Sequence, residues 1–122
     1  MNICVTSQGN TLDAPVDPRF GRCQFFVIVD PETLQYEAVS NPNIDSRGGA
    51  GIQSGQIMAE KQVKAVLTGD VGPNAFQTLK TAGIPIMTGA SGTVREAIEK
   101  YKKGEFQETQ GPTSDAMMAH GK

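Results

Sequence analysis

The chain has 122 residues, of which 38% are apolar and 20% charged, a composition that fits one globular domain with a buried core. Its formal net charge of -2 excludes a protein-wide positive field for nucleic acid or an anionic membrane, so an anion site must be built locally. The sequence predicts neither a membrane span nor a signal peptide. Two cysteines, Cys4 and Cys23, are too few for a disulfide scaffold, and we expect reduced thiols in a cytoplasmic protein.

The first third of the chain is predicted to form three strands. Apolar runs indicate a buried strand at 2–7 and a central strand at 24–29, and alternation indicates a half-buried edge strand at 34–40. The second and third strands form a hairpin. Residues 8–23 form a loop whose length is typical of a functional segment.

Helices and short strands alternate in the remainder of the folded region. A first helix over 52–61 is expected to turn Ile52, Gly55 and Ala59 toward the core, with Met58 beside them. A strand at 65–68 follows.

A second helix begins at Gly72-Pro73-Asn74, buries Phe76 and Leu79, and stops at Gly83. Pro85 places the next strand, 84–87, at a sheet edge. The third helix begins with the capping box Thr93-Val94-Arg95-Glu96 and ends at Gly104.

Together these elements predict a mixed α/β sheet of order 3-2-1-4-5 with helices on both faces. Strands 1, 4 and 5 are expected to be parallel and strand 2 antiparallel to strand 1. Residues 1–104 form this single domain, and residues 105–122, which lack periodicity, are expected to be a flexible C-terminal tail. Ligands of such sheets usually bind beyond the carboxyl ends of the parallel strands, where 8–23 and 69–72 leave the sheet.

Residues 18–23, Pro-Arg-Phe-Gly-Arg-Cys, combine groups that suit an anion or an anionic metal–sulfur species. Arg19 and Arg22 can pair with oxyanions or polarisable anions, Gly21 lets backbone N–H groups approach closely, and Cys23 is a soft ligand. The alternative interpretation is a loop whose arginines are merely solvated and whose Cys23 is packed.

Two glycine-rich segments precede helices. The free N–H groups at the start of the second helix make residues 72–75 a potential anion site, although a tight turn that needs glycine for φ alone explains the same sequence. Gly48-Gly49-Ala50-Gly51 is a candidate second nest of N–H groups. Its spacing breaks the dinucleotide-binding pattern because Ser54 stands where the third glycine belongs.

Groups for acid–base catalysis are scarce. The single histidine, His120, lies in the predicted tail, so a serine or cysteine nucleophile lacks a rigid base. Asp70 follows the fourth strand without partner acids and is more simply a turn or capping residue. The tail residues Met117, Met118 and His120 could contact copper or another soft metal.

Four motifs occur in order along residues 1–104: Arg-Phe-Gly-Arg-Cys at 19–23, Gly-Gly-Ala-Gly-Ile at 48–52, Gly-Pro-Asn-Ala-Phe at 72–76 and Ala-Ser-Gly-Thr-Val at 90–94. With them the chain resembles the dinitrogenase iron–molybdenum cofactor biosynthesis family of NifX/NafY-like proteins. The resemblance implies a ribonuclease H-like fold and noncovalent carriage of a molybdenum–copper sulfide cluster or another Mo/Fe–sulfur cluster. The folded part lacks a histidine, which favours capture by N–H groups and arginine.

We therefore predict a non-enzymatic carrier of an anionic molybdenum-containing metal–sulfur cluster that sits over the ends of strands 1 and 4. Arg19 and Arg22 would neutralise the cluster, Phe20 would shield it, and backbone N–H groups would donate to its terminal sulfides. The expected cofactor-binding residues are Arg19, Phe20, Gly21, Arg22, Gly49, Ala50, Gly51, Ile52, Gly72, Pro73, Asn74 and Ala75, and the candidate metal ligands are Cys23 and His120.

Two other functions fit the same sequence. One is an enzyme that acts on a small oxyanion through Asp70 or Cys23. The other is a metal-independent regulatory or scaffolding module that binds a protein through strand 3 or strand 5. For the carrier, the expected partners are the cluster and the proteins that donate or receive it, with no nucleic acid and no membrane.

Overall fold

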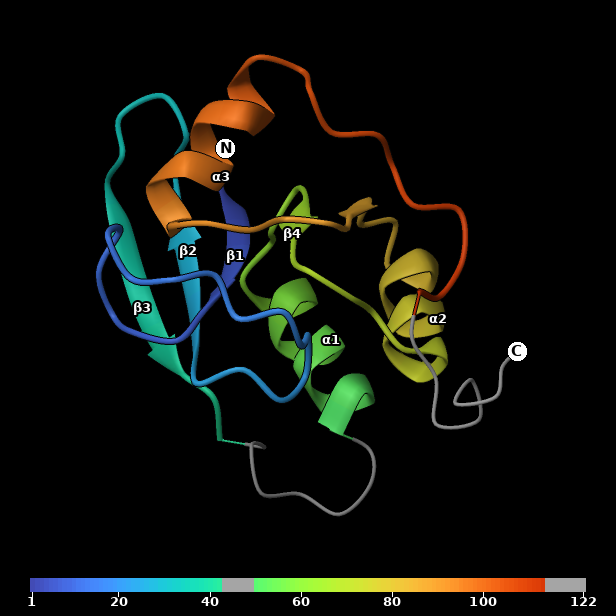
Figure 1. The fold of residues 1–122 in the computed structure, drawn as a ribbon. Coiled ribbons are helices and arrows are strands. Elements are labelled where there is room, and N and C mark those ends of the chain that lie inside the picture. Colours follow the sequence, from blue (N-terminus) through green and yellow to red (C-terminus); the bar gives the residue numbers. More distant parts are fainter. Residues whose placement is uncertain (43–49, 114–122) are drawn as a thin grey trace.

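Five strands and three helices form one mixed α/β unit (Figure 1). The computed structural model describes residues 1–42 and 50–113, with Ala50 described by its backbone alone. The elements are β1 (Ile3–Ser7), β2 (Phe25–Val29), β3 (Tyr36–Ser40), α1 (Ala50–Glu60), β4 (Val66–Leu67), α2 (Pro73–Thr81), β5 (Ile86–Met87) and α3 (Val94–Lys102).

The sheet has the predicted order, β3-β2-β1-β4-β5. β1 pairs antiparallel with β2, with Val5 opposite Val27, and parallel with β4, with Val5 beside Leu67. β4 pairs parallel with β5. All five side chains of β1 are buried because this central strand is covered on both faces.

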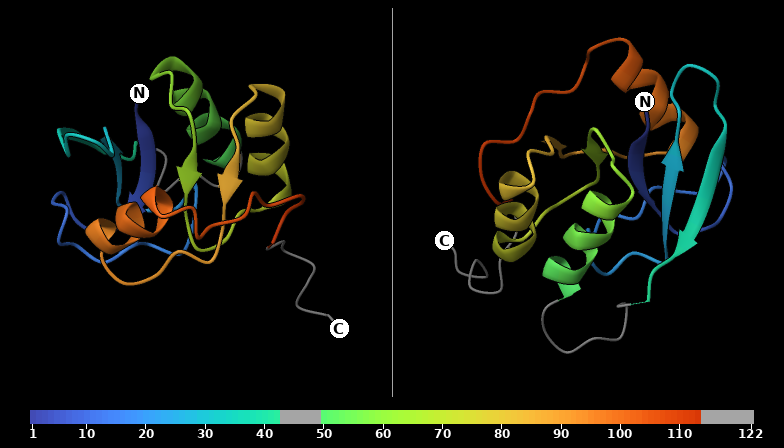
Figure 2. Two further views of the ribbon diagram at one scale, coloured as in Figure 1. Left: turned by 90° about the horizontal axis from the view of Figure 1, so that it is seen from above. Right: turned by 180° about the vertical axis from the view of Figure 1, so that it is seen from behind.

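Helices cover both faces of the sheet, as Figure 2 shows. On one face, Cys4 and Phe26 pack with Met58 of α1 and Leu79 of α2. On the other face, strand residues such as Val5 and Val27 pack with Ile98 of α3. The two sets alternate along the strands, because successive side chains point to opposite faces.

The predicted inward face of α1 is wrong at two positions. Ile52 is 40% exposed and Ala59 is exposed, whereas Ser54, Gly55 and Met58 are buried. The reason is close packing of small residues against α2: a Cβ added at Gly55 would lie 2.6 Å from Cγ2 of Thr78. This approach, rather than apolar side-chain area, sets the face that α1 buries.

The helix ends follow the predicted signals. Pro73 occupies the first turn of α2, and Gly83 beyond its end takes a φ of +76°. At the start of α3, the Thr93 side chain accepts from the Glu96 N–H (3.1 Å), and the Glu96 carboxylate accepts from the Thr93 N–H (2.9 Å). Gly104 ends this helix region with a φ of +71°.

Most strand and helix boundaries differ from the predictions by one or two residues, and two differences have a clear structural cause. β3 starts at Tyr36 because Leu34 lies in the hairpin turn, with a φ of +63°. β5 lies at the sheet edge as expected, but residues 105–113 run beside it instead of forming a free tail. We call residues 105–113 the C-terminal strap.

Several backbone N–H groups fix this strap to the domain. Thr109 N–H donates to the Ile86 carbonyl (2.7 Å), and Thr88 N–H donates to Thr109 Oγ1 (3.2 Å). Thr113 N–H donates to the Val71 carbonyl (2.8 Å), which brings the strap to the loop before α2. Sequence periodicity missed this segment because it makes single hydrogen bonds without regular secondary structure. The remainder of the predicted tail, 114–122, lies outside the described residues.

Candidate functional site

A buried polar cluster holds the long loop against the carboxyl ends of β1 and β4. The Thr6 hydroxyl donates to the Asp17 carbonyl (2.7 Å) and also shares a hydrogen bond with the Thr68 hydroxyl (2.8 Å). Asp17 N–H donates to the Thr6 carbonyl (2.9 Å). These bonds fix the start of the segment that carries Arg19.

Asp17 orients Arg19, and it is a functional position that the sequence analysis missed. The Asp17 carboxylate is 1% exposed and accepts from the Arg19 backbone N–H (3.0 Å) and from Nε of its guanidinium (3.2 Å). The hydrogen bond and charge of Asp17 raise the pKa of Arg19. An Asp side chain that accepts from the N–H two residues later is a common turn, so the Asp-Pro-Arg sequence held the signal. The Arg19 side chain remains 60% exposed.

The Arg19 segment runs beside the loop that follows β4. Asp70 N–H donates to the Pro18 carbonyl (2.7 Å), and Phe20 N–H donates to the Asp70 carbonyl (3.3 Å). A Cβ added at Gly69 would lie 2.6 Å from Cα of Pro18, and Gly69 does not take a positive φ. Position 69 therefore requires glycine because the Pro18 backbone approaches closely, and not because of a positive φ.

Phe20 and Cys23 are core residues, contrary to the roles predicted for them. The Phe20 side chain is 7% exposed, and its ring centroid lies 5.8 Å from that of Phe26. Cys23 is fully buried; burial, and then the charge of Asp17, raise the pKa of its thiol to about 12. In this arrangement the Phe20 ring packs in the core, and Cys23 is a protonated thiol at neutral pH.

Gly21 lies between these two inward-facing residues. It takes a φ of +95°, which L side chains rarely adopt, and its carbonyl accepts from the Asn41 side-chain amide (3.1 Å). The same amide donates to the Cys23 carbonyl (2.9 Å). Arg22 is half-buried between them.

The first turns of α1 and α2 lie against each other. A Cβ added at Gly51 would lie 3.0 Å from Cβ of Ala75, so glycine permits this contact. Gly72 caps α2 without a side-chain hydrogen bond. Within the described part of the chain, nothing accepts from the N–H groups of Asn74 or Ala75. Both helices begin on the lower side of the molecule in Figure 1, beside the long loop.

The structure thus pairs Arg19 with Asp70, two residues before the N-cap of α2, and packs the first turn of α2 against Gly51 in the first turn of α1. Ala50 begins α1, whereas Gly49 and His120, with Met117 and Met118, lie outside the described residues. We call Arg19, Gly51, Ile52 and residues 72–75 the helix-start site.

Ser54 is a second position that the sequence analysis did not select. It is fully buried one turn inside α1, and its hydroxyl has no hydrogen-bond partner among the described residues. This burial was not predictable from the sequence, because serine is usually exposed.

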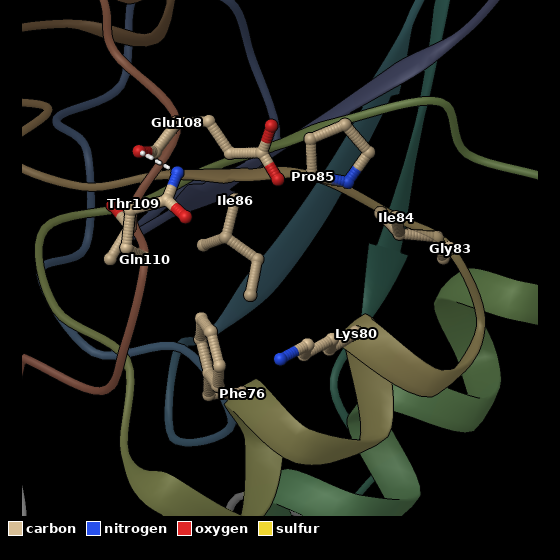
Figure 3. Close-up of a pocket in the computed structure, with 9 residues that line it drawn as sticks. All are labelled: Phe76, Lys80, Gly83, Ile84, Pro85, Ile86, Glu108, Thr109 and Gln110. Carbon is tan, nitrogen blue, oxygen red and sulfur yellow. Dashed lines mark hydrogen bonds between the residues drawn. The ribbon is translucent and has the colours of Figure 1, made fainter.

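A separate hollow of about 330 Å³ lies between α2, the start of β5 and the C-terminal strap (Figure 3). Phe76, Ile86 and Pro85 supply apolar lining, and Lys80 and Glu108 supply charges. It lies at the amino end of β5, away from the carboxyl ends where the helix-start site is built.

Residues 1–42 and 50–113 contain no group of three or more His, Cys, Asp or Glu side chains placed to hold a metal ion. None of the helices in the same ranges is long and apolar enough to cross a membrane.

The geometry defines a mixed α/β fold in which the N-termini of α1 and α2 pack together and the Arg19 segment pairs with the loop after β4. The chain belongs to the dinitrogenase iron-molybdenum cofactor family, whose model matches residues 1–104. This finding confirms the resemblance seen in the four motifs. It supports a role in iron–molybdenum cofactor biosynthesis or in binding a metal cluster.

Similar proteins have the same fold along nearly their whole length. The apo form of the orange protein from Desulfovibrio gigas is 41% identical, with 93% of this chain and 96% of that chain covered and a TM-score of 0.89. A candidate NifB protein from Thermotoga is 34% identical, with coverage of 93% and 97% and a TM-score of 0.80. Protein MJ0580 of Methanocaldococcus jannaschii is 27% identical over 110 residues, which are 88% of this chain and 90% of that protein.

Proposed function

We propose that the protein binds and carries, noncovalently, an anionic molybdenum-containing metal–sulfur cluster at the helix-start site. The cargo would be a molybdenum–copper sulfide cluster or a nitrogenase-type iron–molybdenum precursor. The proposal is supported by the contact between Gly51 and Ala75, which joins the first turns of α1 and α2, and by the pairing of Arg19 with Asp70, two residues before Gly72.

The electrostatics of the site suit an anion. Each helix N-terminus is equivalent to about +0.5 elementary charge, so two adjacent ends attract an anion without a buried cationic side chain. The N–H groups of Asn74 and Ala75 are available donors within the described part of the chain. Asp17 accepts from Nε and Nη2 of Arg19, which leaves the other guanidinium N–H groups for a ligand.

The contacts also suit sulfide, which is large and polarisable. Ile52 is a large apolar side chain exposed at the first turn of α1, where it can pack against a sulfide-rich surface. Because the Cys23 thiol is buried and protonated, we propose that the cargo keeps its own sulfide ligands and receives hydrogen bonds, not thiolates, from the protein. Gly21 and Arg22 stay in the proposed site as supports of the Arg19 loop.

We also propose that the protein carries this cargo without transforming it. The enzyme alternative needs Cys23 or Asp70 to react, yet the Cys23 thiol is buried and protonated at neutral pH. Membership of a cofactor family favours exchange with donor and recipient proteins, and we place this role in the cytoplasm on a ribonuclease H-like fold.

The test is to mix the protein with tetrathiomolybdate, with and without copper, and to follow its visible absorption through desalting. Wild-type protein should retain colour at a fixed molybdenum ratio. Arg19→Ala should weaken retention by about 3- to 10-fold, a modest loss because the side chain is largely exposed. The matched control is Arg95→Ala, which removes another arginine paired with an aspartate, on α3.

Three results would count against the proposal. If desalting removes the colour from the wild-type protein, the proposed carrier function is contradicted. Equal losses in Arg19→Ala and Arg95→Ala would remove the site assignment. Turnover of a small oxyanion that Asp70→Asn abolishes would favour the enzyme alternative. Circular dichroism of each variant establishes that it is folded.

A further inference from the structure

The Ser54 hydroxyl is an unusual buried polar group in α1. The Ser54 side chain is fully buried, and no group in residues 1–42 or 50–113 bonds to its hydroxyl. Buried polar groups are nearly always hydrogen-bonded, because losing water without gaining a partner is costly. A helical serine can satisfy itself by donating to the carbonyl four residues earlier, but Ser54 does not make that bond.

Helix geometry directs this hydroxyl toward the helix-start site. Every Cα–Cβ bond of an α-helix tilts toward the N-terminus, so the Ser54 side chain leans over the turn that begins at Ala50 and Gly51. Gly51, three residues earlier on the same face, has no side chain of its own, and Ala75 of α2 packs against it. The rise from Gly51 to Ser54 is about 4.5 Å, within reach of one ligand atom seated at the helix start.

We infer that the Ser54 hydroxyl is a binding group of the helix-start site, which donates a hydrogen bond to a terminal sulfide or oxide of the bound anion. The inference rests on the proposed function and names a residue that the cargo must reach. It also selects a class of cargo: a compact anion with a projecting acceptor atom can reach Ser54, whereas a flat or fully protein-ligated cluster cannot.

If Ser54 has this role, Ser54→Ala should maintain or raise the stability of the apo protein and lower its affinity for the anion. The apo variant should unfold at the same temperature as the wild type or at a higher one, because a buried hydroxyl without a partner has been removed and alanine favours the helix. Its affinity for tetrathiomolybdate should fall by about 10-fold, because a hydrogen bond to a charged ligand is lost. A merely structural hydroxyl would not separate these two readouts.

The experiment titrates the full chain with tetrathiomolybdate and measures thermal unfolding of the apo protein. The control is Thr78→Val, which removes a hydroxyl that α2 already uses, since Thr78 Oγ1 donates to the Asn74 carbonyl (3.0 Å). Thr78→Val should leave the affinity unchanged.

Each contrary result has its own meaning. If Ser54→Ala binds as tightly as the wild type while Arg19→Ala does not, the Ser54 assignment is wrong and the carrier site stands. If apo Ser54→Ala unfolds at a lower temperature than the wild type, the hydroxyl has a structural partner such as a buried water, and the inference is overturned. If the wild type retains no tetrathiomolybdate, both the proposed function and this inference fail.

Discussion

Gly69→Ala tests whether close backbone approach holds the Arg19 segment in place. The added Cβ would meet Cα of Pro18 at 2.6 Å and the Pro18 carbonyl oxygen at 2.9 Å. Both contacts involve the backbone, so no side-chain rotation can relieve them. The segment that carries Arg19 must therefore move away from the loop after β4.

The expected loss of stability has two sources. Overpacking of this kind costs roughly 1–3 kcal/mol. The displacement also strains the Asp70 N–H bond to Pro18 (2.7 Å) and the Phe20 N–H bond to Asp70 (3.3 Å), each worth about 1 kcal/mol. Together we expect a decrease of about 2–4 kcal/mol in the free energy of unfolding. Such a decrease is a large part of the roughly 5–15 kcal/mol typical of a domain.

Urea unfolding followed by circular dichroism measures this change. With a typical slope of about 2 kcal/mol per molar urea, the midpoint should fall by about 1–2 M. The control is Gly111→Ala, because a Cβ there meets nothing within 4 Å. Gly111→Ala should stay within about 0.5 kcal/mol of the wild type. If Gly69→Ala lowers the free energy of unfolding no more than Gly111→Ala does, close approach does not hold the Arg19 segment against the loop after β4, and the reasoning fails.

Two further predictions concern the core and a helix cap. The folded state keeps the Cys23 proton up to a pKa of about 12, whereas the unfolded thiol loses it above about 9, so unfolding is favoured as pH rises through this window. The free energy of unfolding should fall between pH 9 and 11, by at most about 1.4 kcal/mol per pH unit for this thiol. If the free energy of unfolding of Cys23→Ala falls as steeply with pH, this prediction is contradicted. Thr93→Ala should cost about 1 kcal/mol in thermal unfolding, since it removes the cap of α3, whereas the exposed neighbour Ser91→Ala should cost little; equal melting temperatures for these two variants would refute the capping argument.

The sheet order was predictable from the sequence because each strand and helix carries its own local signal. The apolar run Phe25–Val29 marks a covered strand, Pro73 and Gly83 mark the ends of α2, and Thr93 with Glu96 marks the start of α3. These signals act over a few residues, so they survive without knowledge of tertiary contacts. Parallel pairing then follows from the helices that connect the strands.

The candidate site was only partly predictable, since its decisive contacts join distant segments. Arg19 and residues 72–75 were selected from their chemistry, and the structure places them together. Phe20 and Cys23 were expected to face a bound cluster. In the structure both side chains face the core, and Gly21, which lies between them in the chain, takes a positive φ. The inward face of α1 was misjudged because a glycine contact with Thr78 outweighs apolar area at Ile52.

The strap beside β5 has a consequence for how molecules of this protein can associate. Pro85 has no N–H, and the Ile86 carbonyl already accepts from Thr109 N–H. This edge therefore has few free backbone groups with which another strand could pair. At the opposite edge, β3 has a strand neighbour on one side only among the described residues. If two molecules join through their β3 edges, the combined sheet ends in a strapped edge at both sides. Edge-to-edge growth therefore stops at a pair, which protects a concentrated solution of the protein from fibre formation.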